Sequence, residues 1–179
     1  SDISNFRDRK EDTASGTLFY RFLPKTSFLL EYDFTRVKYD HETDLDGDVT
    51  AILGGIKWEV TEKMTGTIKA GYLKKDFESS VRNNFDGVIF SLAIDHQFTE
   101  FTSIRLMGER RINETNIVGP DYSTITEGYG EFTQRLTSKI SAVINGSYGV
   151  EKYNKAITVG TVTDIREDRV WNAGAGLRY

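Results

Sequence analysis

The chain has 179 residues, of which 38% are hydrophobic, 12% aromatic and 28% charged, and 23 basic against 27 acidic residues give a net charge of −4. This length is enough for one domain, and the acidic balance supplies no basic field for nucleic acid, which argues against such a partner. The lack of cysteine excludes a disulfide framework and thiolate chemistry. Two histidines, His41 and His96, leave little for a zinc site, and no apolar stretch approaches the roughly 18 residues of a membrane helix.

Hydrophobic and polar side chains alternate from the first part of the chain onward. Residues 14–22 carry Ala, Gly, Leu, Tyr and Phe at every second position, and residues 28–34 continue with Phe, Leu, Tyr and Phe. A period of two is typical of β-strands, and aromatic and β-branched residues fit their pleated surface. No segment shows a sustained helical period. The sequence therefore predicts an all-β fold.

Four short turn-like segments recur at equal spacing. They begin at Leu23, Thr61, Thr99 and Thr137, each 38 residues after the one before. Between them lie two strands and a longer polar connection. The polar connections are residues 39–48, 78–87, 112–124 and 154–168. Because self-similarity at a fixed period defines an architecture, we predict repeated hairpins with all tight turns at one end and all long connections at the other.

The two faces of the predicted strands differ in polarity. One face is mostly apolar, with aromatic residues near both ends: Tyr20, Phe22, Trp58 and Phe98 beside the turns, and Tyr32, Phe34, Tyr72 and Tyr148 toward the long connections. The other face carries the charged residues Lys57, Glu59, Lys69, Asp95, Arg105, Glu109, Arg111, Glu127, Glu131 and Arg135.

A soluble sandwich or barrel also alternates, but its strands usually run about 5–6 residues. The strands here are about twice that length, which suits a tilted membrane crossing of roughly 9–11 residues, and two aromatic girdles are what bilayer interfaces select. The pattern therefore favours an antiparallel, up-and-down transmembrane β-barrel whose polar face lines the lumen.

The predicted strands number nine, near residues 13–22, 27–39, 49–60, 65–77, 88–98, 103–115, 125–136, 140–153 and 167–179. Bacterial single-chain barrels have even numbers of strands. Either residues 1–6 add a partial tenth strand, or a longer N-terminal part completes the barrel. Residues 1–179 are accordingly a single β-barrel domain or the C-terminal part of a larger barrel.

Candidate chemistry is sparse. His41, beside Asp40 and Asp44, can be interpreted as part of a protease site at the barrel rim or as a solvated loop histidine; the second is favoured because no second acidic pair stands at a matching position. Asp44, Asp46 and Asp48 suggest calcium, but Gly47 and Gly55 occupy the wrong places for an EF-hand loop. No nucleophile motif appears. We predict a non-enzymatic protein without metal or cofactor.

Three basic residues stand on the apolar face just beyond the aromatic positions. Arg36 and Lys74 occupy the same place in the repeat, and Arg110 lies one step nearer the turn. They are predicted to meet anionic head groups of outer-membrane lipid through charge-assisted hydrogen bonds. Simple snorkelling into water is the alternative.

The segments SGTLFYRFLPKTSFLLEYDF, GGIKWEVTEKMTGTIKAGY and NAGAGLRY resemble bacterial outer-membrane barrels, and the chain over residues 13–179 is most similar to the putative beta-barrel porin 2 family. The end of the chain, with Asn172, Gly174, Leu177 and Tyr179, resembles the assembly signal of outer-membrane proteins, which implies the barrel assembly machinery as a partner.

The resemblance implies the outer membrane of a Gram-negative bacterium, with long connections outside the cell and tight turns in the periplasm. Several family members belong to exopolysaccharide loci, so it also implies a porin-like conduit for an exported polysaccharide. The alternative is a closed structural or ligand-binding barrel with interaction loops. In a closed barrel the lumen charges would pair and plug it, whereas in a wide one they would set selectivity.

Overall fold

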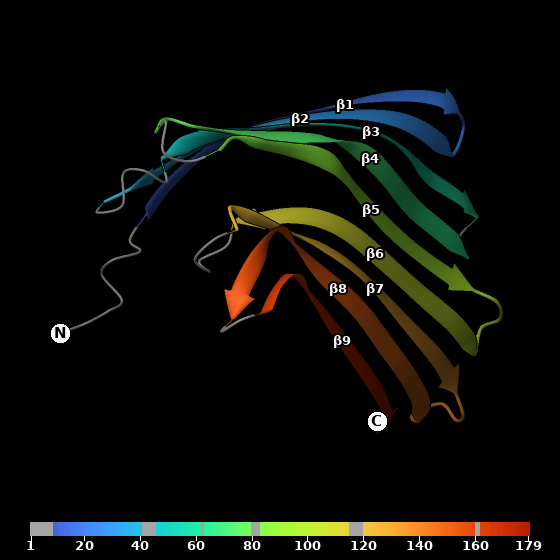
Figure 1. The fold of residues 1–179 in the computed structure, drawn as a ribbon. Helices are drawn as coiled ribbons and strands as arrows, with labels where there is room; N and C mark the ends of the chain where they lie inside the picture. The colour runs from blue at the N-terminus through green and yellow to red at the C-terminus, as the bar shows by residue number, and fades with distance from the viewer. Residues whose placement is uncertain (1–8, 41–45, 62, 80–82, 115–119, 160–161) are drawn as a thin grey trace.

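A computed structural model describes residues 9–40, 46–61, 63–79, 83–114, 120–159 and 162–179. Nine strands form one antiparallel sheet in which each strand pairs with the next along the chain (Figure 1). Their bounds are β1 Arg9–Leu23, β2 Thr26–Tyr39, β3 Gly47–Thr61, β4 Met64–Phe77, β5 Phe85–Gln97, β6 Thr102–Glu114, β7 Tyr122–Arg135, β8 Ser141–Val159 and β9 Val162–Arg178. The prediction of an all-β, up-and-down fold is confirmed. Within these ranges, no helix has the length and hydropathy to cross a membrane.

The predicted boundaries of β1–β7 agree with the structure within four residues, but the last connection was predicted wrongly. Residues 154–168 form no long loop: β8 continues to Val159, β9 starts at Val162, and the register pairs Ala156 with Ile165. The reason lies in the sequence, since residues 156–165 are rich in Ile, Val and Thr, which favour strands. A register irregularity between Lys152 and Ala156 separates this extension from the rest of the hairpin.

The sheet is strongly curved, and its two ends differ (Figure 1). The tight connections between β1 and β2, β3 and β4, β5 and β6, and β7 and β8 lie together at one end, the turn end, with the C-terminus. The ends of the strands that precede and follow the other four connections lie at the opposite end, the loop end, where β1 begins at Arg9. This is the arrangement that the repeat predicts.

Side-chain exposure distinguishes the two faces. Leu29, Ala51 and Leu53 are only 6%, 7% and 7% exposed, whereas their neighbours Leu30 and Ile52 are 51% and 52% exposed. Because curvature crowds side chains on the concave side, the face of Leu29 is the inner face and the face of Leu30 is the outer face. Because side chains alternate between the faces along a strand and register partners share a face, these assignments extend to every strand of the sheet.

The outer face is apolar and uncovered. Large exposed hydrophobic side chains on it are Leu18, Tyr20, Phe28, Leu30, Tyr32, Ile52, Ile56, Ile68, Tyr72, Val88, Phe90, Leu106, Phe132, Ile144, Tyr148, Trp171, Leu177 and Tyr179. Soluble monomers rarely expose contiguous apolar patches above a few hundred Å². An outer face of this composition requires an apolar surrounding such as lipid.

The edges of the sheet, β1 and β9, are not paired with each other in the described part of the chain. Arg9 pairs with Tyr39 at the loop end and Arg178 pairs with Ser141 at the turn end, so both edge strands run from the loop end to the turn end. Antiparallel closure would therefore need an odd number of strands between them. The structure matches part of a barrel.

The outer face generates a direct test. Ile68 lies mid-strand on the outer face, 46% exposed, and pairs with Ile56 and Leu92, whereas Thr67 next to it points to the inner face. A charge facing lipid near the midplane costs about 2–4 kcal/mol. We expect Ile68→Asp and Leu92→Arg to lower the free energy of unfolding by this amount, and Thr67→Asp to lower it by much less. Urea unfolding of the protein folded in lipid vesicles measures the difference, and equal losses on both faces would contradict a membrane location.

Candidate functional site

The ten charged residues predicted for the polar face all lie on β3–β7 at inner-face positions. Most of them form ion pairs: Asp95 with Arg105 at 2.7 Å, and Lys57 with Glu59 at 3.2 Å. Arg135 makes no ion pair within the described residues. That this face lines an aqueous lumen remains a prediction, but its charges are already organised in pairs of opposite sign.

One ion pair bridges a whole strand. Lys69 Nζ on β4 lies 2.9 Å from Glu31 Oε1 on β2, above β3, and the two residues are 38 positions apart. Gly55 of β3 stands directly opposite Lys69 in the register. A Cβ atom at Gly55 would clash with the backbone carbonyl oxygen of Ile68 and would lie 3.1 Å from both Cα and Cγ of Lys69. The glycine therefore leaves room for the lysine to cross, and the pair, with side chains 26% and 21% exposed, is the most shielded ion pair of the middle of the inner face.

A second group contains two acids that face each other. Glu109 and Glu127 are direct partners in the register of β6 and β7. Like charges in such positions are destabilising. The guanidinium of Arg111 contacts both carboxylates, at 2.8 Å from Glu127 Oε1, and so holds the two acids in place. Farther along the inner face of β7, the Tyr129 hydroxyl donates a hydrogen bond to the Glu131 carboxylate at 2.7 Å.

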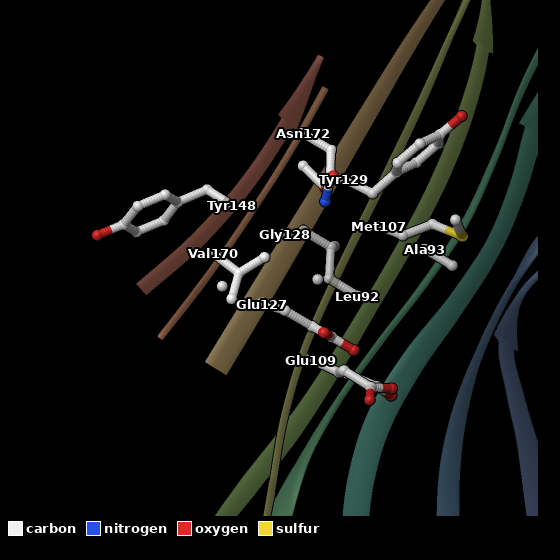
Figure 2. A pocket seen from close by; sticks show the side chains of 14 residues that line it. Leu92, Ala93, Met107, Glu109, Glu127, Gly128, Tyr129, Tyr148, Val170 and Asn172 are labelled. Atoms are coloured by element: carbon white, nitrogen blue, oxygen red, sulfur yellow. The ribbon is translucent and has the colours of Figure 1, made fainter. Parts of the chain in front are cut away.

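A hollow of about 530 Å³ opens beside these acids. Figure 2 shows Met107, Tyr129, Glu109 and Glu127 on the inner side of the strands, with Tyr148 projecting in the opposite direction. The residues that line the hollow are Ser91, Leu92, Ala93, Met107, Gly108, Glu109, Glu127, Gly128, Tyr129, Ser147, Tyr148, Gly149, Val170 and Asn172. Its size is within the range of small-molecule sites, roughly 300–1,000 Å³.

The sequence did not reveal an apolar cluster at the loop end. Val37, Tyr39, Phe77 and Phe85 are buried against one another, each at most 8% exposed. Lys75, 1% exposed, places its ammonium 4.6 Å from the centre of the Phe77 ring. The sequence pattern places Tyr39 where the predicted strand 27–39 meets a polar connection and Phe85 within the connection 78–87, whereas in the structure both lie in strands, β2 and β5. Their alternation with the strand residues was the available signal.

A polar network ties the loop end together. The Asp121 carboxylate accepts from Lys155 Nζ at 2.6 Å and from Asn83 at 3.4 Å, and the Asn154 side chain accepts from the Asp121 N–H at 2.9 Å. Burial, at 14% side-chain exposure, acts to raise the pKa of Asp121, but the hydrogen bonds from Lys155, Asn83 and Asn154 outweigh it and hold this pKa below the usual range. The network joins three neighbouring hairpins.

The residues predicted to meet lipid head groups lie on the outer face toward the loop end, where acids accompany two of them. Arg36 Nε lies 3.1 Å from Asp48, and Lys74 Nζ lies 2.7 Å from Asp76. Arg110 stands opposite Thr126 in the register and makes no ion pair within the described chain. Their contact with lipid stays a prediction.

The residues of the predicted assembly signal are divided between the faces of β9. Asn172 lies on the inner face and donates to Ser147 Oγ at 3.2 Å. A Cβ at Gly174 would lie 2.9 Å from Asn145 Oδ1. Leu177 and Tyr179, 74% and 89% exposed, belong to the outer side. The assembly role itself stays a prediction.

The metal and protease interpretations gain no support. His41 and Asp44 lie outside the described residues. Asp46 accepts from the Tyr39 N–H at 2.6 Å, and Asp48 pairs with Arg36, so the two acids face different partners. No group of three metal-ligating side chains occurs among the residues described. His96 packs against Phe98 with ring centres 4.5 Å apart.

The crossing of Lys69 over Gly55 can be tested with adjacent glycines. We expect Gly55→Val to cost at least about 1–3 kcal/mol, because the added side chain overpacks against the Ile68 carbonyl and against Lys69 and blocks the path of Lys69 to Glu31. Gly54→Val is the matched control, since nothing lies within 4 Å of a Cβ there. Urea unfolding measures both. If Gly55→Val breaks the ion pair between Lys69 and Glu31, then Glu31→Gln lowers the free energy of unfolding less in the Gly55→Val variant than in the wild type. An equal loss in both backgrounds would show that Lys69 still reaches Glu31 across β3.

Comparison with known proteins agrees with this geometry. No curated protein matches the chain at a significant level. A family model described as Putative beta-barrel porin 2 matches residues 3–179, which is nearly the whole sequence. The apolar outer face, the charged inner face and the up-and-down topology are features that a barrel porin requires. The chain belongs to the putative beta-barrel porin 2 family.

Proposed function

We propose that this protein is a non-catalytic, porin-like barrel of the outer membrane of a Gram-negative bacterium, whose inner face lines a path for hydrophilic solutes. The observation that carries this proposal is the contrast between the faces: ion pairs such as Arg105 with Asp95 on the inner side, and Leu30, Ile52 and Ile68 uncovered on the outer side. In this orientation the loop end lies outside the cell and the turn end faces the periplasm, as in outer-membrane barrels with short periplasmic turns.

The cargo that fits the inner face best is a hydroxylated polymer such as an exported polysaccharide. Neutralised charges leave little net field along this wall, and hydroxyl and amide groups stand between them, among them Thr67, Ser91, Asn145 and Ser147. Such groups exchange hydrogen bonds with a sugar chain without holding it by charge. Several members of the family that this chain resembles belong to exopolysaccharide loci, which points to the same cargo.

A closed structural or ligand-binding barrel with interaction loops is the second candidate. It is favoured by the apolar cluster of Val37, Tyr39, Phe77 and Phe85, which fills the inner face near the loop end. Interlocked charges would also suit a shut interior, because unpaired buried charges are costly. Conductance separates the two candidates.

We expect residues 1–179 alone to give no steady conductance in planar bilayers, because β1 and β9 leave the sheet of the described residues open, whereas the full-length protein in a complete barrel gives steady conductance with weak ion selectivity. Replacing Arg105 and Arg111 together by Ala removes positive charge from the wall and leaves Asp95, Glu109 and Glu127 behind, so the reversal potential in a salt gradient should move toward cation preference. Arg110→Ala is the control, since Arg110 adjoins Arg111 but lies on the outer face. An equal shift with the control would contradict the assignment of faces, and a full-length protein without conductance would favour the closed barrel.

We further propose that Arg36, Lys74 and Arg110 contact the phosphates of outer-leaflet lipid. Arg36 and Lys74 would share their charge between lipid and the neighbouring Asp48 and Asp76. Replacing all three basic residues by Ala should reduce the number of anionic lipids retained by the protein in native mass spectrometry, because charge-assisted hydrogen bonds are lost. Unchanged retention would leave snorkelling into water as their role.

A further inference from the structure

The hollow of the inner face is built from two adjacent rows of residues across β5–β9. The row nearer the loop end is Ser91, Glu109, Glu127, Gly149 and Val170, which face one another in the register. The row nearer the turn end is Ala93, Met107, Tyr129, Ser147 and Asn172. In both rows large side chains on β6 and β7 stand between small ones on β5 and β8. The small residues give the hollow its depth and the large ones form its walls.

The walls are held in fixed positions. The Tyr129 hydroxyl donates to Glu131 at 2.7 Å, which fixes the plane of the ring. Asn172 donates to Ser147 at 3.2 Å, and Arg111 contacts Oε1 of both Glu109 and Glu127. A carboxylate has about four acceptor positions, so both acids keep acceptor capacity toward the hollow. A site of this kind needs little ordering when a ligand arrives.

The two walls differ in chemistry. Met107, Ala93 and the Tyr129 ring offer an apolar and aromatic surface, whose π face attracts partially positive C–H groups. Glu109, Glu127 and the Asn172 carbonyl offer hydrogen-bond acceptors. Two carboxylates against one guanidinium leave the acidic side with a net negative charge. A ligand that satisfies both walls has a flat apolar face and several hydroxyl or ammonium donors, and carries no negative charge.

We propose that this hollow is a binding subsite for one ring of a neutral or amino-bearing saccharide. The Tyr129 ring stacks on the apolar face of the sugar, while Glu109 and Glu127 accept from neighbouring hydroxyls or from an ammonium group. The same acids disfavour a uronate ring by repulsion. The inference deepens the proposed conduit by naming the class of cargo that its wall recognises, but binding at the hollow does not require an open channel.

The test is calorimetric titration of the folded protein in a detergent without a sugar head group, since glycosidic detergents would compete for the site. The probes are hexamers of glucosamine, of α-1,4-linked glucose and of galacturonate. We expect the glucosamine and glucose hexamers to bind, the former more tightly, and the galacturonate hexamer to bind at least tenfold more weakly than either.

Variants assign the binding to the hollow. Tyr129→Leu should weaken binding of the glucose hexamer roughly three- to tenfold, as expected for loss of one aromatic contact, whereas Tyr129→Phe keeps the ring and should stay close to wild type. Glu127→Gln should abolish the preference for glucosamine over glucose. Phe132→Leu is the matched control, because Phe132 lies on the same strand β7 but on the outer face, 39% exposed, and does not line the hollow.

Three outcomes would overturn the proposal: no binding of the glucosamine and glucose hexamers, tightest binding of the galacturonate hexamer, or equal losses with Tyr129→Leu and Phe132→Leu. Circular dichroism of each variant checks that the sheet is intact. The conductance experiment keeps this result separate from the proposed function. A protein that conducts but binds no saccharide contradicts the subsite alone, and one that binds saccharide without conducting contradicts the conduit alone.

Discussion

Backbone hydrogen bonding is the constraint on which this structure depends. Inside a bilayer no water is present to satisfy N–H and C=O groups, so a strand must find its partners in the neighbouring strands. Here every strand pairs with the next one along the chain. The ladder also fixes the register, and a slip by one residue would turn Ile68 and Leu92 inward and Lys69 outward. The separation of the faces is thus a consequence of pairing, and the charges of the inner wall depend on it.

The inner wall shows how glycine and charge act together. Lys69 reaches Glu31 because Gly55 leaves the intervening strand without a side chain at that position. Arg111 plays a comparable role between two opposed acids, where it turns a repulsive pair into a bridged one. Each of these pairs is partly exposed and individually weak. Their combined effect is that the charges of the inner wall are largely neutralised by partners of opposite sign, which suits solutes that are recognised by hydroxyl groups.

Periodicity predicted most of the fold, because a period of two and a repeat of 38 residues are both imposed by geometry. The repeat even relates residues that touch: Glu31 and Lys69, and Asn83 and Asp121, are each 38 positions apart. Periodicity could not predict which acid a base selects, since Arg111 contacts both Glu109 and Glu127 across different spacings. It also failed at the β8 extension, where Ile, Val and Thr stand among the polar residues of the predicted connection 154–168, and at Phe85, which stands in the predicted polar connection 78–87. The hollow beside Tyr129 depends on side-chain volumes in five strands at once, which no local pattern encodes.

The parallel direction of the two edge strands has a consequence for how such a protein can change in size. Duplication or loss of a 38-residue unit adds or removes two strands, and so leaves β1 and β9 pointing the same way. Growth by whole hairpins can widen the sheet without ever making its edges complementary. Only an odd number of added strands, such as half a unit, makes the directions of the two edges suitable for antiparallel closure. Gain or loss of whole repeats therefore changes the width of the wall, while antiparallel closure depends on a change by an odd number of strands.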